Sequence, residues 1–227
     1  GGLGEFGING LLLERGQERR LLDAGLRFAG AEMPGIDSIV PDYEALRGPG
    51  RLHAILLTHG HEDHIGALAF ALDAAKAPVY GSRLTLGFVR RRLRERGVSA
   101  ELLPLEPGRA LEVGPFRVHP IRVAHSVTDS LAMAIETPAG TVLTSGDFKI
   151  DPQAPPEQRT DQQALAEWGR RGVRVLLSDS TNVEARGYTG GEDAVLPVFE
   201  DVFARTRGRV LVSCFATSVP RIQRVAE

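Results

Sequence analysis

Residues 58–66 read Thr58-His59-Gly60-His61-Glu62-Asp63-His64-Ile65-Gly66, directly after an apolar segment at 54–57. Half of the six histidines in the chain lie in this run, together with an aspartate. Imidazole and carboxylate groups are ligands that suit Zn²⁺ and similar divalent ions. His59 and His61 alternate, so both reach the same side of an extended segment, while Asp63 and His64 follow at the start of the next element. The spacing predicts one loop that holds two metal ions side by side.

A purely structural role explains this run poorly, because a buried histidine with satisfied hydrogen bonds does not account for three histidines in six residues. The run also looks like the zinc-protease motif H-E-x-x-H. In that motif the second histidine comes four residues after the first, and position 65 is an isoleucine, so the match fails. His53 and His119 stand apart from the run and are interpreted as ordinary, partly exposed histidines.

Polar residues also follow other apolar runs, at the points where predicted strands end. They are Asp23, His125, Asp147 and Asp179. Ligands and catalytic groups commonly lie just past the ends of core strands. Burying an unpaired carboxylate costs several kcal/mol, so a shared metal cluster would satisfy Asp147 and use Asp23 and Asp179 to orient ligands. An aspartate after a strand is also a common turn former or helix N-cap. That interpretation is favoured for Asp23 alone, and for Asp179 the two are balanced.

The apolar runs predict a mixed α/β protein in which hairpins come first and helices later. Strands are expected at 8–13, 19–22, 52–58, 79–80, 116–123, 131–136, 141–145, 173–177 and 209–215. Helices are expected at 65–77, 84–96, 162–171 and 192–205, with a last one that begins at 217 or 218. Pro120 predicts an edge or a bulge in its strand. The mixture indicates sheets covered by helices rather than a doubly wound fold.

Composition bounds the class of protein. With 227 residues, 42% of them hydrophobic, the chain is long enough for one large domain or slightly more. No apolar run approaches the roughly 20 residues that cross a bilayer, so no membrane association is expected. The single cysteine, Cys214, excludes an internal disulfide and favours a cytoplasmic location. The chain has no initiator methionine, so a fragment of a longer protein is expected.

Six segments match motifs of one protein family. They lie at 1–9, 22–25, 58–66, 125–130, 146–149 and 177–182. On these segments, and over nearly its whole length, the chain resembles the metallo-β-lactamase fold and, within it, the β-CASP nucleases of the ribonuclease J family. The motif at 58–66 alone is shared by thioesterases, lactonases and lactamases. The joint presence of Gly146-Asp147-Phe148-Lys149 and Asp179-Ser180-Thr181-Asn182 is typical of RNA-processing nucleases.

The resemblance implies a set of site residues. The first metal ion is bound by His59, His61 and His125, the second by Asp63 and His64, and Asp147 bridges both. The ions are Zn²⁺, with Mn²⁺ or Mg²⁺ as alternatives, and together they activate a hydroxide that attacks phosphorus. The implied catalytic groups are Asp147, Asp63 as a proton acceptor, and Asp179, which in the family helps orient a later histidine that donates a proton.

The resemblance also implies the architecture and activity. A four-layer αββα sandwich, incomplete, is expected at 1–180, and the truncated start of a β-CASP α/β domain at 181–227. The expected enzyme is a metal-dependent ribonuclease for RNA processing or decay, acting as a 5′-exonuclease, an endonuclease or both. A cytoplasmic homo-oligomer of the full-length protein is expected, with RNA as its substrate. The remaining family ligand of the second ion is a downstream histidine that these residues do not include.

Two alternatives stay open from the sequence. One is a hydrolase of the same fold that acts on a small thioester or lactone, and the other is a catalytically incomplete fragment that binds metal weakly. A basic run at 90–96 offers contacts for a phosphate backbone, but a solvated helix face is the favoured interpretation. RNA as the substrate therefore depends on the resemblance.

Overall fold

Strand β5 (Arg51–Leu56) shows why this chain folds into stacked layers, because its second half is buried on both faces. Successive side chains of a strand point to opposite faces. Ile55 packs among helix residues, and Leu56 packs among residues of a second sheet. A strand without a polar face needs cover on both sides. The sequence of β5 thus requires one layer of helices and one further sheet.

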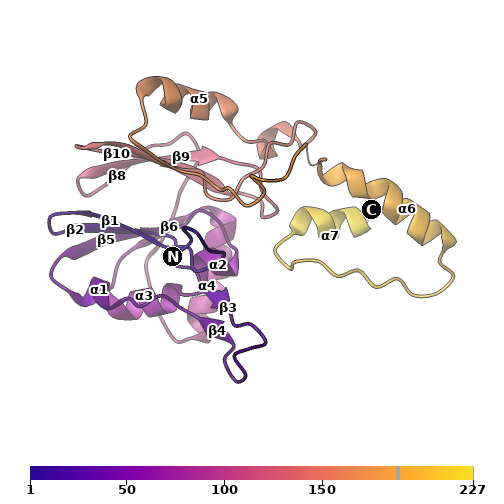
Figure 1. Ribbon diagram of the computed structural model, residues 1–227, viewed down its shortest axis with the longest axis horizontal. Helices are drawn as coiled ribbons and strands as arrows, with labels where there is room; N and C mark the ends of the chain where they lie inside the picture. Colours follow the sequence, from indigo (N-terminus) through magenta and orange to yellow (C-terminus); the bar gives the residue numbers. More distant parts are fainter. Residues whose placement is uncertain (188–189, 227) are drawn as a thin grey trace.

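The structure is a computed structural model that describes residues 1–187 and 190–226. Its first sheet has the order β1-β2-β5-β6-β7, with β1 and β2 antiparallel and the other neighbours parallel. The other strands are β1 (Leu11–Arg15), β2 (Glu18–Leu22), β6 (Val79–Gly81) and β7 (Leu102–Pro104). Helices α1 (Glu44–Arg47), α2 (Glu62–Ile65), α3 (Leu68–Ala74) and α4 (Arg83–Glu95) lie on its outer side (Figure 1).

The second sheet has the order β12-β11-β10-β9-β8 and is antiparallel except for its β11–β12 pair. Its strands are β8 (Leu111–Val113), β9 (Phe116–Arg122), β10 (Leu131–Thr137), β11 (Gly140–Thr144) and β12 (Val175–Leu177). Helix α5 (Gln162–Arg171) covers the outer face, and its Trp168 is buried against residues of β9, β10 and β11. A short pair, β3 (Arg27–Phe28) and β4 (Ser38–Ile39), lies outside both sheets.

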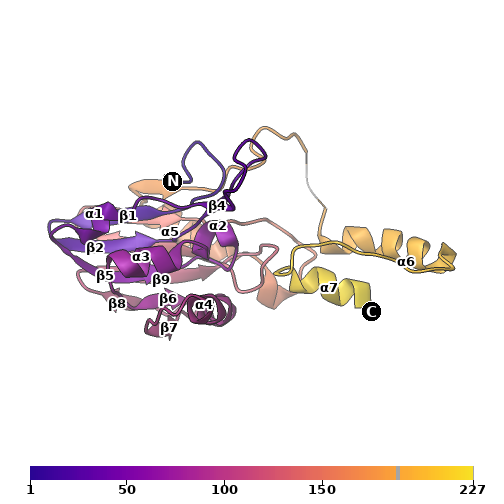
Figure 2. The same cartoon turned by 90° about the horizontal axis from the view of Figure 1, so that it is seen from below.

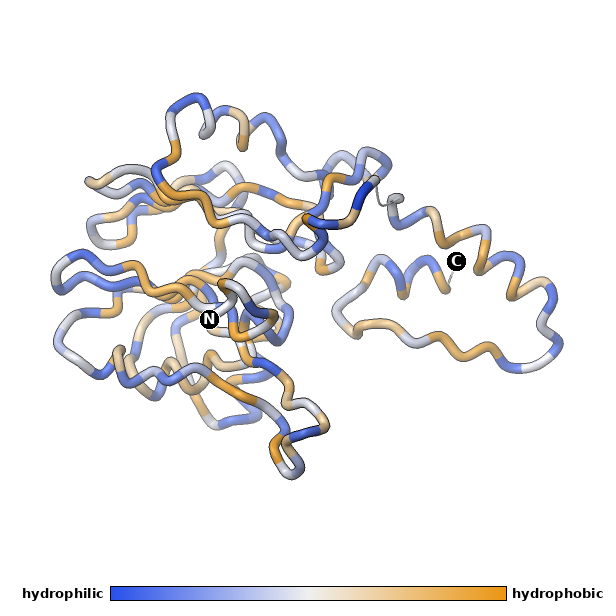
Figure 3. The backbone as a smooth tube through the Cα atoms, in the orientation of Figure 1, coloured by the Kyte–Doolittle hydropathy of each residue, from blue (hydrophilic) through white to orange (hydrophobic). Residues whose placement is uncertain are grey.

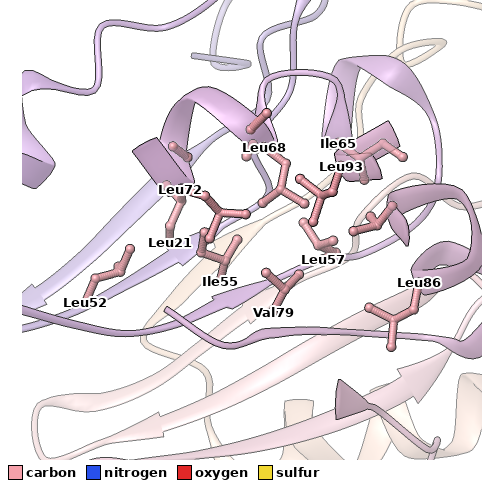
Figure 4. Close-up of a cluster of buried hydrophobic side chains, with 14 of the residues drawn as sticks. Leu21, Leu52, Ile55, Leu57, Ile65, Leu68, Leu72, Val79, Leu86 and Leu93 are labelled. Atoms are coloured by element: carbon pink, nitrogen blue, oxygen red, sulfur yellow. The ribbon is translucent and has the colours of Figure 1, made fainter. Parts of the chain in front are cut away.

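Three apolar layers separate these four layers of secondary structure. The largest lies between the first sheet and its helices, where Leu57, Leu68 and Val79 meet (Figure 4). Each fully buried leucine, isoleucine or valine contributes roughly 1.5–3 kcal/mol relative to an exposed one, so the apolar layers hold the stack together. The predicted αββα sandwich is confirmed.

Pro120 lies in β9, opposite Met133 of β10. On the other side β9 pairs with β8 only as far as Val118, so Pro120 stands where that side has no strand partner. Proline lacks the N–H that a strand ladder requires. Pro120 therefore lies at an edge position, as expected, although the first half of β9 is paired on both sides.

The predicted helix at 65–77 is wrong in its extent, because the structure has two short helices, α2 and α3. The chain leaves the first at Gly66, and the backbone N–H of Ala67 donates to the carbonyl of Ala24 at 2.8 Å rather than to a helical partner. This tertiary hydrogen bond gives no signal in the periodicity of the sequence. It sets α2 apart as a single turn that carries the end of the histidine run.

The predicted strand at 209–215 is also wrong, because these residues form no strand and pair with no strand of the described chain. Strand N–H and C=O groups need a partner, and here the neighbouring elements are helices. Leu211 and Phe215 are largely exposed, and Figure 3 shows apolar residues along this connection.

The C-terminal segment lies beside the sandwich (Figures 1 and 2). It contains a short 3₁₀ turn at Glu192–Val195, helix α6 (Leu196–Arg205) and helix α7 (Val219–Ala226). Glu192 connects it to the sandwich, since its carboxylate accepts from Lys149 Nζ at 2.7 Å and from Arg221 Nη2 at 2.8 Å. Within residues 1–187 and 190–226, every helix is too short or too polar to cross a membrane.

Candidate metal centre

Histidine and aspartate side chains from both sheets meet at one edge of the sandwich. His59, His61, Asp63 and His64 follow β5 of the first sheet, in the loop and in α2. His125 lies between β9 and β10 of the second sheet, and Asp147 follows β11. Because these strands end at the same edge, segments that lie far apart in the sequence converge there. All six residues that were predicted as metal ligands are brought together.

The first group consists of three imidazole nitrogens and one carboxylate oxygen from His59, His61, His125 and Asp147. His61 Nδ1 lies 3.0 Å from His59 Nε2 and 3.2 Å from His125 Nε2. Asp147 Oδ2 lies 3.7 Å from His59 Nε2 and 3.6 Å from His125 Nε2. Four such atoms facing one point make the set that tetrahedral Zn²⁺ sites use.

The second group consists of Asp63, His64 and Asp147. His64 Nε2 lies 3.6 Å from Asp63 Oδ2 and 3.3 Å from Asp147 Oδ1. Asp147 therefore turns one carboxylate oxygen, Oδ2, toward the first group and the other, Oδ1, toward the second. In each group the ligand atoms lie within 4.8 Å of one another. The donor chemistry of both groups fits divalent cations, and a shared carboxylate fits a pair of them.

Burial keeps the imidazoles of the first group neutral, which is the form that binds metal. It lowers the pKa of His59 well below its ordinary value, and the neighbouring histidines add to this effect. It also lowers the pKa of His125 to about 4, although the Asp147 carboxylate acts in the opposite direction. The pKa of His61 is lowered by burial as well. These side chains need lose no proton to become ligands.

His64 differs from the other histidines of the site. Burial alone would lower the pKa of His64, but the carboxylates of Asp23 and Asp147 outweigh it and raise the pKa to about 10. In return, the hydrogen bond and charge of His64 hold the pKa of Asp147 below its usual value, against the effect of burial. The two carboxylates therefore favour the protonated form of His64, and a cation that binds Nε2 competes with a proton there.

Asp23 holds His64 and the start of the histidine run in place. Its carboxylate accepts from the backbone N–H and the hydroxyl of Thr58 at 2.8 and 2.9 Å, and it lies 2.8 Å from His64 Nδ1. Asp23 has a φ of +59°, which costs a non-glycine residue of order 1–3 kcal/mol. Its side chain therefore orients the ligand His64. This role comes in addition to the turn-forming role that its position in the sequence favours.

Asp179 lies near the site but belongs to neither ligand group. Its carboxylate accepts from the hydroxyl of Thr181 at 2.6 Å and from the backbone N–H groups of Thr181 and Phe148 at 2.9 and 3.3 Å. Its own N–H donates to Ser145 Oγ at 2.8 Å. These bonds fix the path of the chain next to Asp147. The structure thus places Asp179 among loop contacts rather than among the ligands.

Helix α4 supports the histidine run from outside. A Cβ atom on Gly60 would lie 2.5 Å from the ring of Phe88, so only glycine lets the loop and the helix approach this closely. One turn further along α4, Arg92 forms an ion pair with Glu62. Arg91 pairs with Glu95 in the same way, at 2.9 Å. The structure thus uses Arg92 and Arg91 of the basic run for contacts within the fold.

Three residues that contact the ligands were missed in the sequence. Ser126 Oγ lies 3.4 Å from His61 Nε2. Thr58 Oγ1 lies 3.1 Å from His59 Nδ1. Asn9 Nδ2 lies 3.1 Å from both Asp63 Oδ2 and His64 Nε2. Thr58 opens the histidine run and Asn9 ends the family motif at 1–9, but neither motif indicates that these side chains contact the ligands. Only the folded chain brings Asn9 to the site.

Comparison with known proteins agrees with this geometry. Residues 3–179 match the Metallo-beta-lactamase superfamily. The chain is 42% identical over 227 residues to Ribonuclease J of Synechocystis sp., and this match covers 98% of this chain and 36% of the relative. It is 37% identical over 228 residues to Ribonuclease J 2 of Staphylococcus aureus, and this match covers 99% of this chain and 41% of the relative. The chain therefore spans well under half the length of these relatives.

Among solved structures, a protein of unknown function from Enterococcus faecalis V583 superposes on 96% of this chain and 60% of its own, with a TM-score of 0.65. The two sequences are 16% identical, so the likeness concerns the fold alone. The family match spans most of the chain and contains every residue of both ligand groups. With its stacked sheets and its paired histidine–aspartate groups, this chain belongs to the metallo-beta-lactamase superfamily.

Proposed function

We propose that this protein is a metal-dependent ribonuclease that hydrolyses RNA phosphodiester bonds. The observation that carries the proposal is the junction of two ligand groups at Asp147, in a chain similar over its whole length to proteins named Ribonuclease J. Two cations side by side suit phosphodiester hydrolysis, because both the attacking and the leaving oxygen need stabilisation. RNA is the substrate proposed, in processing or decay.

The proposed ligands are the residues of the two groups. His59, His61 and His125 would hold the first ion, Asp63 and His64 would hold the second, and Asp147 would contact both. Zn²⁺ is the ion proposed, with Mn²⁺ or Mg²⁺ as alternatives that accept the same nitrogen and oxygen ligands. When bound, the ions supply Lewis-acid polarisation of phosphate oxygens and lower the pKa of water toward neutrality.

The protein's own residues provide position and proton transfer. Asp147 turns Oδ2 toward the first group and Oδ1 toward the second, so its carboxylate is placed to contact both ions. The Asp63 side chain is 40% exposed, which lets it reach solvent and accept the proton that the attacking water loses. The new bond joins that water oxygen to phosphorus, and the bond to the 3′-oxygen breaks. For Asp179 we propose the role that its motif suggests, which is to help orient a later histidine that donates a proton.

We also propose that the catalytic unit comprises residues 1–180 and that residues 181–227 begin a second, β-CASP unit. The family match ends at residue 179, and the segment beyond it lies beside the sandwich (Figure 2). A cytoplasmic location and self-association of the full-length protein remain predictions.

Substrate assays on the complete gene product test the proposed function. We expect cleavage of a labelled 5′-monophosphorylated RNA into products with 5′-phosphates, and loss of cleavage after chelation that an added divalent ion restores. Analysis of the products separates removal of single nucleotides from internal cleavage. Turnover of a thioester or of nitrocefin, without cleavage of RNA, would show that the fold serves a small-molecule hydrolase instead.

Replacement of His59 by alanine should reduce the metal content of the protein. His59 is fully buried and supplies one of four atoms in the first group, so its loss leaves three. We expect about one ion fewer per chain after dialysis, measured by elemental analysis. His53→Ala is the matched control, because His53 lies in β5, pairs with Glu18 of the neighbouring strand β2 and lies outside both ligand groups. Unchanged stoichiometry in His59→Ala would remove His59 from the ligand set.

A further inference from the structure

The N-terminal loop packs against the second ligand group through backbone hydrogen bonds. The N–H of Asn9 donates to the carbonyl of Asp63 at 3.0 Å, and the carbonyl of Asn9 accepts from Gly25 at 2.8 Å. In the same place the N–H of Ala24 donates to the carbonyl of His64 at 2.8 Å. Three segments of chain are thereby joined side by side. These bonds fix the backbone of Asn9 next to α2 whatever its side chain is.

The side chain of Asn9 turns from this fixed position toward the ligand atoms. Its Nδ2 lies 3.1 Å from Asp63 Oδ2 and 3.1 Å from His64 Nε2. These are the ligand atoms of the second group that the first group does not share. Its Oδ1 points the other way, since a Cβ on Gly2 would lie 2.3 Å from it. The carboxamide thus presents its donor to the site and its acceptor to the loop.

The two ligand groups differ in what restrains their side chains. In the first group the imidazoles contact one another, with the rings of His59 and His61 4.8 Å apart, and His59 is fully buried. In the second group His64 is held at Nδ1 by Asp23. Asp63 is 40% exposed, so packing restrains its carboxylate less. A hydrogen bond from a neighbour is the remaining way to hold it.

We propose that Asn9 is a positioning residue for the second metal ion, acting through Asp63. Donation from its amide to Oδ2 holds the Asp63 carboxylate toward His64 and Asp147 before an ion arrives. The entropy of ordering that side chain is then lost on folding rather than on metal binding. The inference rests on the proposed function in one respect, that ions bind at these groups. Asn9 ends the motif at 1–9, and nothing in the sequence alone assigns that side chain a role.

Metal titration of Asn9→Ala tests the inference. Metal-free protein is titrated with Mn²⁺ or Zn²⁺ by calorimetry, and elemental analysis after dialysis gives the stoichiometry. Loss of a group that orients a ligand weakens metal binding by about 10-fold to 100-fold. We expect this loss for one of the two ions, with the affinity of the other unchanged. Asn9→Ser, whose hydroxyl is too short to reach Asp63, should behave in the same way and provides a second route if the alanine variant folds poorly.

Glu5→Ala is the matched control within the same loop. Glu5 pairs with Arg27 at 3.3 Å, and both side chains are exposed, so its loss loosens the loop without touching a ligand. The inference predicts wild-type affinity for both ions in Glu5→Ala. Equal weakening in Glu5→Ala and Asn9→Ala would overturn it, because order in the loop would then be the cause. Circular dichroism of the metal-free variants confirms that each is folded.

The wild-type protein separates failure of this inference from failure of the proposed function. Two ions bound by the wild type, with both affinities unchanged in Asn9→Ala and Asn9→Ser, would overturn the role of Asn9 and leave the proposed function standing. If the wild type does not bind two ions, both the role of Asn9 and the proposed function are overturned. Weakening of one ion alone in both Asn9 variants supports the role of Asn9.

Discussion

Asp147→Ala should abolish hydrolysis of RNA while the protein stays folded. Asp147 is the one side chain that belongs to both ligand groups, with Oδ2 facing the first and Oδ1 the second. Its removal disables the pair of sites as a unit, and losses of such units are on the order of 10⁴-fold or more in turnover. Its side chain is 30% exposed and follows β11, so no apolar layer depends on it.

Turnover of 5′-monophosphorylated RNA under saturating metal measures this effect, with metal content and circular dichroism recorded on the same sample. Asp73→Ala is the matched control, because Asp73 lies on α3 with its side chain 65% exposed and away from both groups. We expect Asp73→Ala to match the wild type in every measurement. Wild-type turnover in Asp147→Ala would show that the proposed shared ligand is not needed.

Gly25→Ala should strongly destabilise the protein and disrupt the second ligand group. A Cβ atom at position 25 would lie 1.5 Å from the carbonyl oxygen of Asp63 and 2.8 Å from the backbone nitrogen of Asn9. Both neighbours are backbone, so no change of rotamer relieves the overlap, and α2 has to move away. Overpacking of this kind typically costs about 1–3 kcal/mol and occasionally more. We expect the upper end of that range, because three chain segments meet here.

The midpoint of urea unfolding measures the stability of the Gly25→Ala protein, and calorimetry measures its affinity for the second ion. Gly87→Ala is the matched control: it lies in α4, and a Cβ there meets nothing within 4 Å. Alanine is favoured over glycine in a helix by roughly 1 kcal/mol, so this variant should be as stable as the wild type or more so. Wild-type stability in Gly25→Ala would contradict the close approach of the three segments.

The residues alone predicted sheets covered by helices and a gathering of ligands at strand ends, and the family resemblance implied the four-layer sandwich. Ligand residues lie directly after apolar runs such as those that become β5 and β11, and strands of a sheet bring their ends to a common edge. What the sequence could not predict was set by contacts between distant segments. The break after α2 depends on the bond from Ala67 to Ala24, and the approach of Asn9 to Asp63 depends on the N-terminal loop.

The missing strand at 209–215 illustrates a different limit. Its residues have the apolar and β-branched character of a strand, but pairing is a property of two segments, and the described chain offers these residues no partner. For Asp179, too, the sequence position alone left two interpretations open. Its place after a strand suggested both a turn former and a catalytic group, and the bonds to Thr181 describe the turn without testing the catalytic role.

The origin of the ligands in both sheets has a consequence for how the molecule resists unfolding. His59 follows a strand of one sheet and Asp147 a strand of the other. A cation bound by both side chains would cross-link the two sheets of the sandwich at the edge where the ligands meet. Binding to the native state alone adds about 2.7 kcal/mol when free ligand stands at 100 times its dissociation constant. The durability of this fold in a cell would then vary with the supply of metal there.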